Sequence, residues 1–183
     1  NREIDRQDVP NFATNDYLGT DKILEYAIRM GHQTFGIIQG ATDFASAADR
    51  QQAFEDVVRT HQVTVKPEWR KRGTYLPDSG YEAMRAILGA STVPTCIFAA
   101  NDDMAVGAMR ACQDLGYSNP GDISIIGYDD MSYAKYLIPR LTTVRKPTDS
   151  IVKEGVAALT QLLDDSAEKV TKKFIATTLL VRD

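Results

Sequence analysis

Short apolar runs alternate along the chain with longer stretches in which apolar residues recur at helical spacing. The runs at 35–38, 95–100 and 123–128 have the length and composition of buried strands. Helical spacing is found at 16–30, 46–60, 102–115 and 149–164. Strands separated by helices of this length need crossover connections, which place the strands parallel. The pattern therefore predicts an α/β fold with mostly parallel sheets.

Three further signals are local. The tetrapeptide Ser79-Gly80-Tyr81-Glu82 has the form of a capping box, which predicts a helix that begins at Ser79. The short apolar stretch at 63–65 is predicted as a weaker strand, and residues 174–181 are predicted as a final strand.

Composition and charge argue against several classes of protein. The net charge of −4 and the pI of 5.2 do not provide the basic face that holds nucleic acid. Cys96 and Cys112 do not make a disulfide framework, which favours a reducing, cytoplasmic setting. No apolar run approaches the roughly 18 residues that a membrane-spanning helix requires.

The chain contains no G-x-S-x-G, H-E-x-x-H, G-x-G-x-x-G or P-loop sequence. Its two histidines lie in unrelated contexts, which makes a His-based triad or a zinc site a poor reading. We therefore expect no enzyme, no metal and no cofactor. A hydrolase that uses Asp102, Asp103 and Asp129 as acids or metal ligands stays open as an alternative.

Polar side chains follow three of the predicted strands. Asn101 comes after the run at 95–100, Asp129 comes after the run at 123–128, and the loop after 35–38 leads to Ser46 and Arg50. In open parallel sheets, ligands bind beyond the carboxyl ends of the strands. An amide, a carboxylate and a guanidinium at one rim can form paired hydrogen bonds with vicinal hydroxyls. Tyr75 is a candidate for covering the apolar face of a sugar.

Each of these residues also has a purely structural interpretation. Asn101 can serve as a helix N-cap, a role that is compatible with ligand contact. Asp102 and Asp103 suit the first turn of a helix, where negative charge is favourable, and we favour that role for both. Asp129 and Asp130 can form another loop-to-helix cap, and Arg50 can be a solvated helix residue. Tyr75 can be a packing aromatic.

At these same residues the sequence resembles a known family. The segment "IFAANDDMAVGAMRACQDLGYSNPGDISIIGYDD", followed by "IPRLTTVRKP", is similar to the effector-binding domain of the lactose-repressor (LacI/GalR) family of bacterial transcription regulators. The segments "RMGHQTFGIIQG", "DRQQAF" and "TTLLVRD" match the same family in the same order. The resemblance covers essentially the whole chain.

The resemblance implies a periplasmic-binding-protein-like (type I) clamshell of two α/β lobes joined by three crossover strands. Residues 1–31 and 147–165 are expected in an N-terminal lobe that is incomplete in this chain, and residues 32–146 and 166–183 in the C-terminal lobe. The helices at 16–30 and 149–164 would then lose the sheet that they normally cover and expose apolar stripes.

The resemblance also implies the roles of individual residues. Arg50, Asn101 and Asp129 fall on positions that hydrogen-bond the effector, and Ser46 falls on a further contacting position. Tyr75 matches an aromatic that stacks on the ligand, and Asn1 matches a position where some members carry a contacting Asp. Lys146 stands where Gln is common. A cation there could favour an acidic or phosphorylated effector, or could point to solvent, which we favour because of its long stem.

The family dimerises largely through its second lobe. Val106, Met109, Leu137 and Ile138 map to that surface, and the alternative for these residues is ordinary core packing. An exposed Leu-Ile pair beside Pro139 would favour an interface.

Together these observations predict the ligand-binding and dimerisation part of a sugar-responsive, DNA-binding regulator. The expected partners are a sugar-like effector, a second copy of the chain and operator DNA, the last through a helix-turn-helix headpiece that this chain lacks. The expected location is the cytoplasm. A periplasmic sugar-binding protein of an uptake system is the closest alternative.

Overall fold

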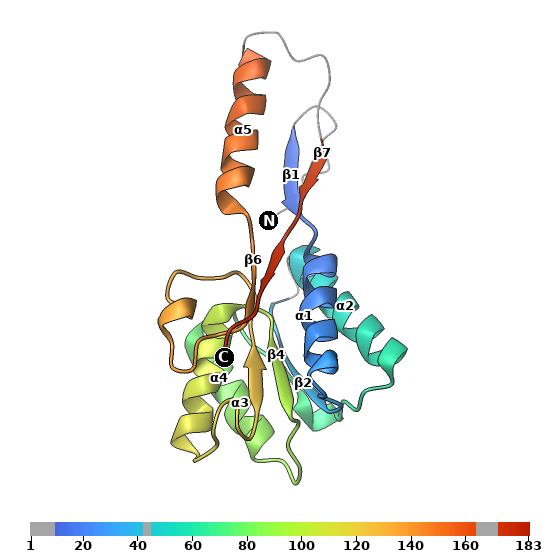
Figure 1. The fold of residues 1–183 in the computed structure, drawn as a ribbon, viewed down its shortest axis with the longest axis vertical. Coiled ribbons are helices and arrows are strands. Elements are labelled where there is room, and N and C mark those ends of the chain that lie inside the picture. Colours follow the sequence, from blue (N-terminus) through green and yellow to red (C-terminus); the bar gives the residue numbers. More distant parts are fainter. Residues whose placement is uncertain (1–9, 42–44, 164–171) are drawn as a thin grey trace.

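A four-stranded parallel sheet forms the centre of the computed structural model, which describes residues 10–41, 45–163 and 172–183. The strand order is β3–β2–β4–β5, and the strands are Arg70–Arg72, Phe35–Gln39, Cys96–Ala99 and Ser124–Ile126 (Figure 1). The three strands β2, β4 and β5 are the apolar runs of the sequence. The prediction of an α/β fold with parallel sheets is confirmed.

Helices cover both faces of this sheet. They are α1 (Asp16–Arg29), α2 (Ala45–His61), α3 (Pro77–Leu88) and α4 (Asp102–Asp114). Figure 1 shows α1 and α2 on one side of the sheet and α3 and α4 on the other. Two short 3-10 helices, η1 (Pro67–Trp69) and η2 (Ala134–Tyr136), lie in the connections.

The side chains of each strand alternate between the two faces of the sheet, so the hydrophobic core has two parts. Ile37 of β2 pairs with Phe98 of β4, which pairs with Ile126 of β5, and all three pack in the cluster that contains Leu24 of α1 and Phe54 of α2. Their neighbours along the strands point the other way, because successive side chains alternate between the faces of a sheet. Ile38, Ile97 and Ile125 accordingly pack in a second cluster, with residues of α3 and α4.

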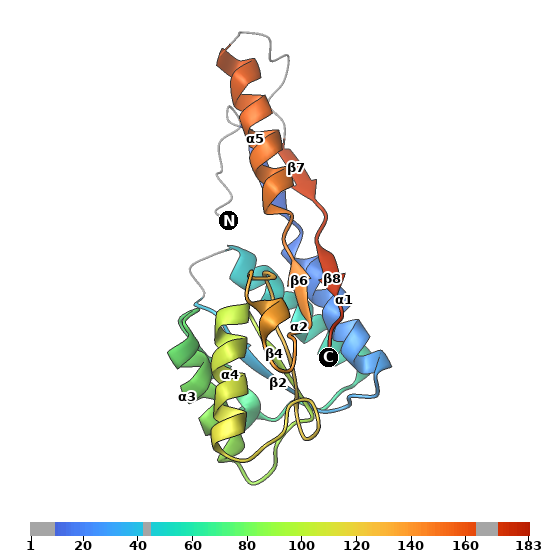
Figure 2. The ribbon, with the colours of Figure 1, turned by 60° about the vertical axis from the view of Figure 1, so that its left-hand side comes forward.

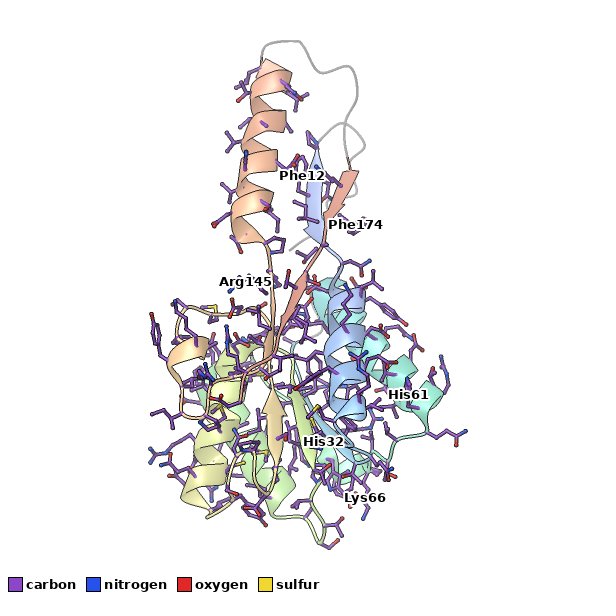
Figure 3. All side chains as sticks on the ribbon, viewed as in Figure 1. Phe12, His32, His61, Lys66, Arg145 and Phe174 are labelled. Carbon is purple, nitrogen blue, oxygen red and sulfur yellow. The ribbon has the colours of Figure 1, made fainter. Side chains whose placement is uncertain are left out.

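An arm extends away from this sheet (Figures 1 and 2). It consists of α5 (Thr148–Leu163) and a parallel pair formed by β1 (Asn11–Thr14) and β7 (Lys172–Ile175). Two antiparallel strands, β6 (Thr143–Arg145) and β8 (Thr178–Leu180), connect the arm to the body. Phe12 of β1 and Phe174 of β7 mark the arm in Figure 3.

The apolar stripes of α1 and α5 were both expected to be exposed. This prediction is confirmed for α5 and wrong for α1. In α5, Val152, Val156 and Leu159 are 58%, 60% and 56% exposed. In α1, by contrast, Ile23 and Leu24 are buried among residues of α2 and the central sheet. Because α2 and the sheet supply its apolar partners, α1 packs with the segment that was expected to form the other lobe. The division into lobes remains a prediction.

Three local predictions need correction. Helix α3 begins at Pro77 rather than Ser79, because proline suits a first helical position that needs no N–H donor. Ser79 instead donates to the Leu76 carbonyl at 2.7 Å. The stretch at 63–65, predicted as a weaker strand, forms only one isolated bridge, between Thr64 and Thr34. The segment at 174–181, predicted as one final strand, holds the end of β7 and the whole of β8.

Strands β1, β3 and β6 were not predicted from apolar patterning. Strand β3 has the sequence Arg-Lys-Arg and lies at the edge of the sheet, where no continuous apolar run is required. In the part of the chain that the structure describes, no helix combines the length and apolarity needed to cross a membrane.

Candidate functional site

The predicted site residues gather in one polar pocket at the carboxyl edge of the sheet. This rim pocket has a volume of about 280 Å³ and is lined by Ser46, Arg50, Tyr75, Asn101, Asp103, Asp129 and Lys146. Asn101 follows β4, Asp129 follows β5, and Ser46 and Arg50 lie near the start of α2. Six of the seven residues predicted for ligand contact therefore meet here. The seventh, Asn1, lies outside the described residues.

Arg50 is the most constrained of these residues. Its side chain is buried, and its Nε and Nη2 donate to Oδ1 of Asp16 at 2.9 and 2.7 Å. Nη1 donates to the Ala100 carbonyl, and the guanidinium carbon lies 3.8 Å from the centre of the Tyr128 ring. Burial alone would lower the pKa of Arg50, but the carboxylates of Asp129 and Asp16 outweigh it and raise the pKa. The alternative of a solvated helix residue is therefore wrong.

Asp16, which holds Arg50, was not singled out in the sequence. It opens α1, is buried, and accepts from the Thr14 hydroxyl at 2.6 Å as well as from Arg50. An acidic residue at a helix start ordinarily indicates a favourable charge for the helix dipole. Only the packing of α1 against α2 reveals that this carboxylate is the partner of a buried guanidinium.

Asn101 performs the capping role and also binds the backbone of Tyr75, whereas its contact with a ligand stays a prediction. Its Oδ1 accepts from the Met104 amide at 3.0 Å and caps α4, whereas its Nδ2 donates to the Tyr75 carbonyl at 3.1 Å. Asn101 thereby ties the start of α4 to Tyr75, which has a positive φ of 65°. The Tyr75 ring lies so close to Gly40 that a Cβ on Gly40 would come within 2.0 Å of it.

Asp129 lies at the centre of the charged network. Its Oδ1 is 2.7 Å from Nζ of Lys146 and 3.4 Å from Nη2 of Arg50. Its backbone has a φ of 116°, which a non-glycine residue rarely adopts, and its amide donates to the Val144 carbonyl of β6 at 2.9 Å. Unusual backbone geometry of this kind concentrates at functional sites.

The structure corrects the interpretation of Lys146 that we favoured. The side chain is 22% exposed, lines the rim pocket and pairs with Asp129, rather than extending into solvent. The reason is its position directly after β6, which runs beside Asp129 through the bridge between Asp129 and Arg145.

The assignment of Asp102 and Asp103 to helix-start charges is incomplete. Asp102 is fully buried and accepts from the Thr143 hydroxyl at 2.6 Å and from the Met131 amide at 2.8 Å. Burial raises its pKa to about 7. Asp103 accepts from the Tyr133 hydroxyl and lines the rim pocket. Within the described ranges, no group of three or more His, Cys, Asp and Glu side chains is placed to hold a metal ion.

Next to the pocket, Asp130 joins the connecting strands. Its Oδ2 accepts from Nε of Arg145 in β6, and its Oδ1 accepts from Nη2 of Arg182 just after β8, both at 2.6 Å. Figure 3 shows Arg145 where β6 leaves the body of the molecule. From the sequence, Asp130 was expected only as part of a cap.

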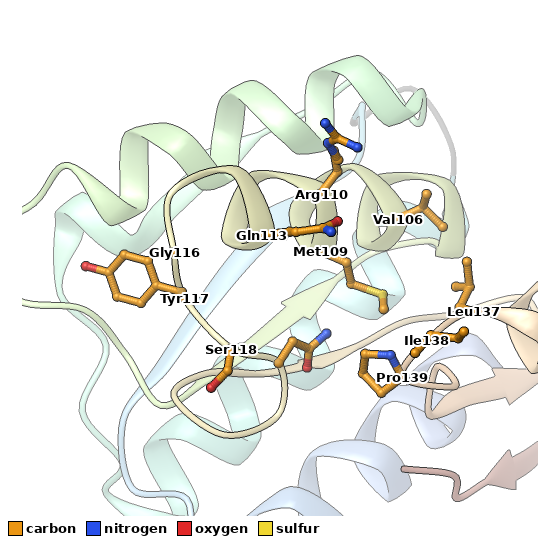
Figure 4. Close-up of a pocket in the computed structure, with 11 residues that line it drawn as sticks. Val106, Met109, Arg110, Gln113, Gly116, Tyr117, Ser118, Leu137, Ile138 and Pro139 are labelled. Carbon is orange, nitrogen blue, oxygen red and sulfur yellow. The ribbon is translucent and has the colours of Figure 1, made fainter.

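The residues predicted for dimerisation line a separate surface groove. Val106, Met109, Leu137 and Ile138 border a hollow of about 590 Å³ together with Pro139 (Figure 4). Ile138 is 97% exposed, so core packing does not account for it. Met109 and Leu137 pack partly against the core and partly face the groove. An exposed apolar patch of this kind is typical of a protein interface.

Comparison with known families and proteins gives consistent matches. The model of the periplasmic binding protein-like domain matches residues 24–183. A probable HTH-type transcriptional repressor, ExuR of Bacillus subtilis (strain 168), is 37% identical over 183 residues, which are 100% of this chain and 55% of the relative. The HTH-type transcriptional repressor PurR of Proteus mirabilis (strain HI4320) is 40% identical over 144 residues, which are 79% of this chain and 41% of that protein. The chain thus spans about half the length of these curated relatives.

Solved structures match the fold over nearly the whole chain. A regulatory protein of the LacI family from Chloroflexus aggregans superposes with a TM-score of 0.91 at 27% identity, covering 100% of this chain and 66% of that one. The Escherichia coli transcriptional repressor ascG gives a TM-score of 0.85 at 27% identity, covering 93% and 62%. The lac repressor dimer bound to operator and the anti-inducer ONPF gives 0.84 at 28% identity, covering 93% and 51%.

Proposed function

Because the chain belongs to the periplasmic binding protein-like domain family and is homologous to LacI/GalR-family repressors, we propose that it is the effector-binding part of a sugar-responsive transcription regulator. The observation that carries this proposal is the rim pocket, in which six residues expected to contact a ligand meet at the carboxyl edge of a parallel sheet. Its polar lining suits a ligand that is rich in hydroxyl groups.

Each side chain has a role in this proposal. Asp129 accepts hydrogen bonds from ligand hydroxyls, and Arg50, held in place by Asp16, donates to ligand oxygens. Asn101 holds the backbone of Tyr75, whose ring covers an apolar face of the ligand. Ser46 supplies a hydroxyl from the start of α2.

The pocket is connected to the strands between body and arm, and this connection supports an allosteric response. The Asp129 amide binds the Val144 carbonyl of β6, and Asp130 binds Arg145 of β6 and Arg182 after β8. A ligand that favours one arrangement of these strands shifts the population of clamshell states. In a regulator, that shift changes the spacing of the DNA-binding headpieces on the operator.

We place the boundary between the lobes differently from the sequence-based expectation. Helix α1 shares its core with the central sheet, which supports a second lobe that begins near residue 15. Strand β7 pairs with β1 in the arm, and this pairing supports the assignment of β7 to the first lobe together with α5. Strand β8 and the residues after it stay with the second lobe.

Dimerisation through the surface groove and action on operator DNA in the cytoplasm complete the proposal. The exposed Ile138 and the apolar groove beside α4 support a self-complementary interface. The net charge of −4 supports DNA contact through a separate headpiece rather than through this domain.

The rival functions have less support. The relatives described above are repressors, so an uptake protein of the same fold is not favoured. The repressor homologues also argue against a hydrolase. In addition, Asp102 and Asp103 are engaged by protein donors, which leaves them poorly suited to act as free acids.

The test is ligand binding by the full-length protein. We would titrate a panel of aldoses, their uronic acids and their phosphate esters by calorimetry, with Asp129→Asn as the site variant and Asp78→Asn as the control. Asp78 lies exposed in the first turn of α3 and does not line the pocket. Binding that Asp129→Asn weakens by about tenfold or more, and that Asp78→Asn leaves intact, supports the proposal. Equal affinities in both variants would place the ligand elsewhere.

A further inference from the structure

Two cationic side chains line the rim pocket, and their surroundings differ. Arg50 is buried and its charge is matched by Asp16, which contacts it through two hydrogen bonds. Lys146 is 22% exposed, and its ammonium group pairs with the carboxylate of Asp129. An ammonium group has three N–H donors, so Lys146 retains donor capacity that can turn toward a ligand.

Asp129 is shared between the two cations. Its Oδ1 lies 2.7 Å from Nζ of Lys146 and 3.4 Å from Nη2 of Arg50. If Lys146 turns to a ligand, Asp129 keeps Arg50 as its partner and presents its oxygens to ligand hydroxyls. The other carboxylate in the pocket, Asp103, already accepts from the Tyr133 hydroxyl.

The start of α2 adds positive potential to the same pocket. Ser46 lines it from the first turn of this 17-residue helix, which is the positive end of the helix dipole. From Ala45 onward, that turn contains no Asp or Glu to neutralise the potential. This feature reinforces Lys146 and Arg50 but would not define a site without them.

From this arrangement we infer that the effector is a sugar carrying one anionic group, a carboxylate or a phosphate, which Lys146 binds. The inference rests on the function proposed above and adds the chemical class of the ligand. The ligand hydroxyls face Asp129 and Asp103, and the anionic group faces Lys146 and the start of α2. A charged hydrogen bond of this kind is about twice as strong as a neutral one, so it discriminates an acid from its neutral parent.

A neutral sugar is the main alternative. The four charged side chains that line the pocket, Arg50, Lys146, Asp103 and Asp129, sum to zero, and in that case Lys146 would serve only to orient Asp129. The two roles have different consequences. An orienting lysine affects all ligands alike, whereas an anion-binding lysine affects only acidic ligands.

The experiment measures an affinity ratio in the full-length protein. Calorimetry gives the dissociation constants of matched triplets, each an aldohexose, its uronic acid and its 6-phosphate, for the unmodified protein and for Lys146→Gln, Lys146→Arg and Lys22→Gln. Lys22 is an exposed lysine of α1 that does not line the pocket, and it controls for the loss of a positive charge. The uronate and phosphate arms distinguish the two possible anionic groups.

We expect at least one acidic ligand to bind about tenfold or more tightly than its neutral parent. Lys146→Gln should bring that ratio close to one, whereas Lys146→Arg and Lys22→Gln should largely preserve it. A neutral sugar that binds as tightly as its acids, or a ratio that Lys146→Gln leaves unchanged, would overturn the inference and leave the proposed function standing. Failure of every member of the panel to bind would overturn both.

Discussion

The carboxylates of the adjacent residues Asp129 and Asp130 serve two different parts of the molecule. Asp129 binds Lys146 and Arg50 in the rim pocket, whereas Asp130 joins Arg145 of β6 to Arg182 after β8. Both residues have a positive φ, 116° and 57°. This dipeptide therefore links the floor of the pocket directly to the strands that lead to the arm.

Removing the charge of Asp130 should weaken that link. Asp130→Asn keeps one neutral acceptor oxygen and places an NH2 donor against the other arginine, at a side chain that is 10% exposed. We therefore expect a loss of about 2 kcal/mol in the free energy of unfolding. Urea denaturation measures this loss. Glu82→Gln is the control. It removes an exposed ion pair in which Nη1 of Arg85 lies 3.9 Å from Oε1 of Glu82, and it should not measurably change the free energy of unfolding. Equal stabilities of the two variants would show that the Asp130 link is energetically unimportant.

The buried carboxyl of Asp102 predicts a specific pH dependence. Its folded-state pKa is raised to about 7 from 3.8, so the folded protein binds the proton more tightly than the unfolded chain. The contribution of Asp102 to stability is therefore most favourable below pH 4 and is lost as the pH rises toward 7, with a slope of at most about 1.4 kcal/mol per pH unit.

Denaturation of the unmodified protein and of Asp102→Asn between pH 4 and pH 8 tests this prediction. Asn cannot titrate, so the variant should gain stability relative to the unmodified protein as the pH rises. A difference between the two proteins that does not change with pH would contradict the raised pKa.

Gly40 should control how Tyr75 covers the pocket. A Cβ at position 40 would come within 2.0 Å of the Tyr75 ring, so Gly40→Ala should displace the ring and weaken ligand binding by about tenfold. Gly89→Ala is the matched control, because the atoms nearest to a Cβ there are backbone oxygens at 3.5 Å and beyond. Calorimetric titration of both variants with the same ligand makes the comparison. Undiminished affinity in Gly40→Ala would argue against a role for Tyr75 in binding.

The surface groove should mediate self-association. Ile138→Asp places a charge on the 97% exposed side chain at the border of the groove, so it should convert a dimer of the full-length protein to a monomer. Leu18→Asp alters an exposed apolar residue of α1 outside the groove and should leave the dimer intact. Sedimentation velocity distinguishes the two states. A dimer that survives Ile138→Asp would place the interface elsewhere.

The sequence predicted the central strands and most of the rim pocket for a common reason. Buried strands such as β4 require continuous apolar runs, and in a parallel sheet the residues that follow them meet at one edge. Asn101 and Asp129 could be found in this way. Strand β3 could not, because an edge strand with the sequence Arg-Lys-Arg carries no apolar pattern.

The features that could not be predicted from the sequence depend on tertiary packing. The partnership of Asp16 with Arg50 joins residues 34 positions apart, and it exists only because α1 packs beside α2. The burial of α1 against the central sheet likewise could not be read from its amphipathic pattern, which any amphipathic helix would show. Lys146 was misjudged because a long flexible side chain is normally solvated, and its pairing with Asp129 depends on the path of β6.

The most direct test of the account is the affinity of the full-length protein for its operator DNA, measured with and without a saturating ligand identified by the panel. We predict that the ligand changes the dissociation constant of the operator complex by about tenfold or more in the unmodified protein, a typical allosteric coupling. We also predict that Asp129→Asn raises the ligand concentration needed for half of this change by about tenfold or more, because the variant binds the ligand more weakly. The same half-effective ligand concentration in both proteins would contradict the assignment of the rim pocket as the regulatory site.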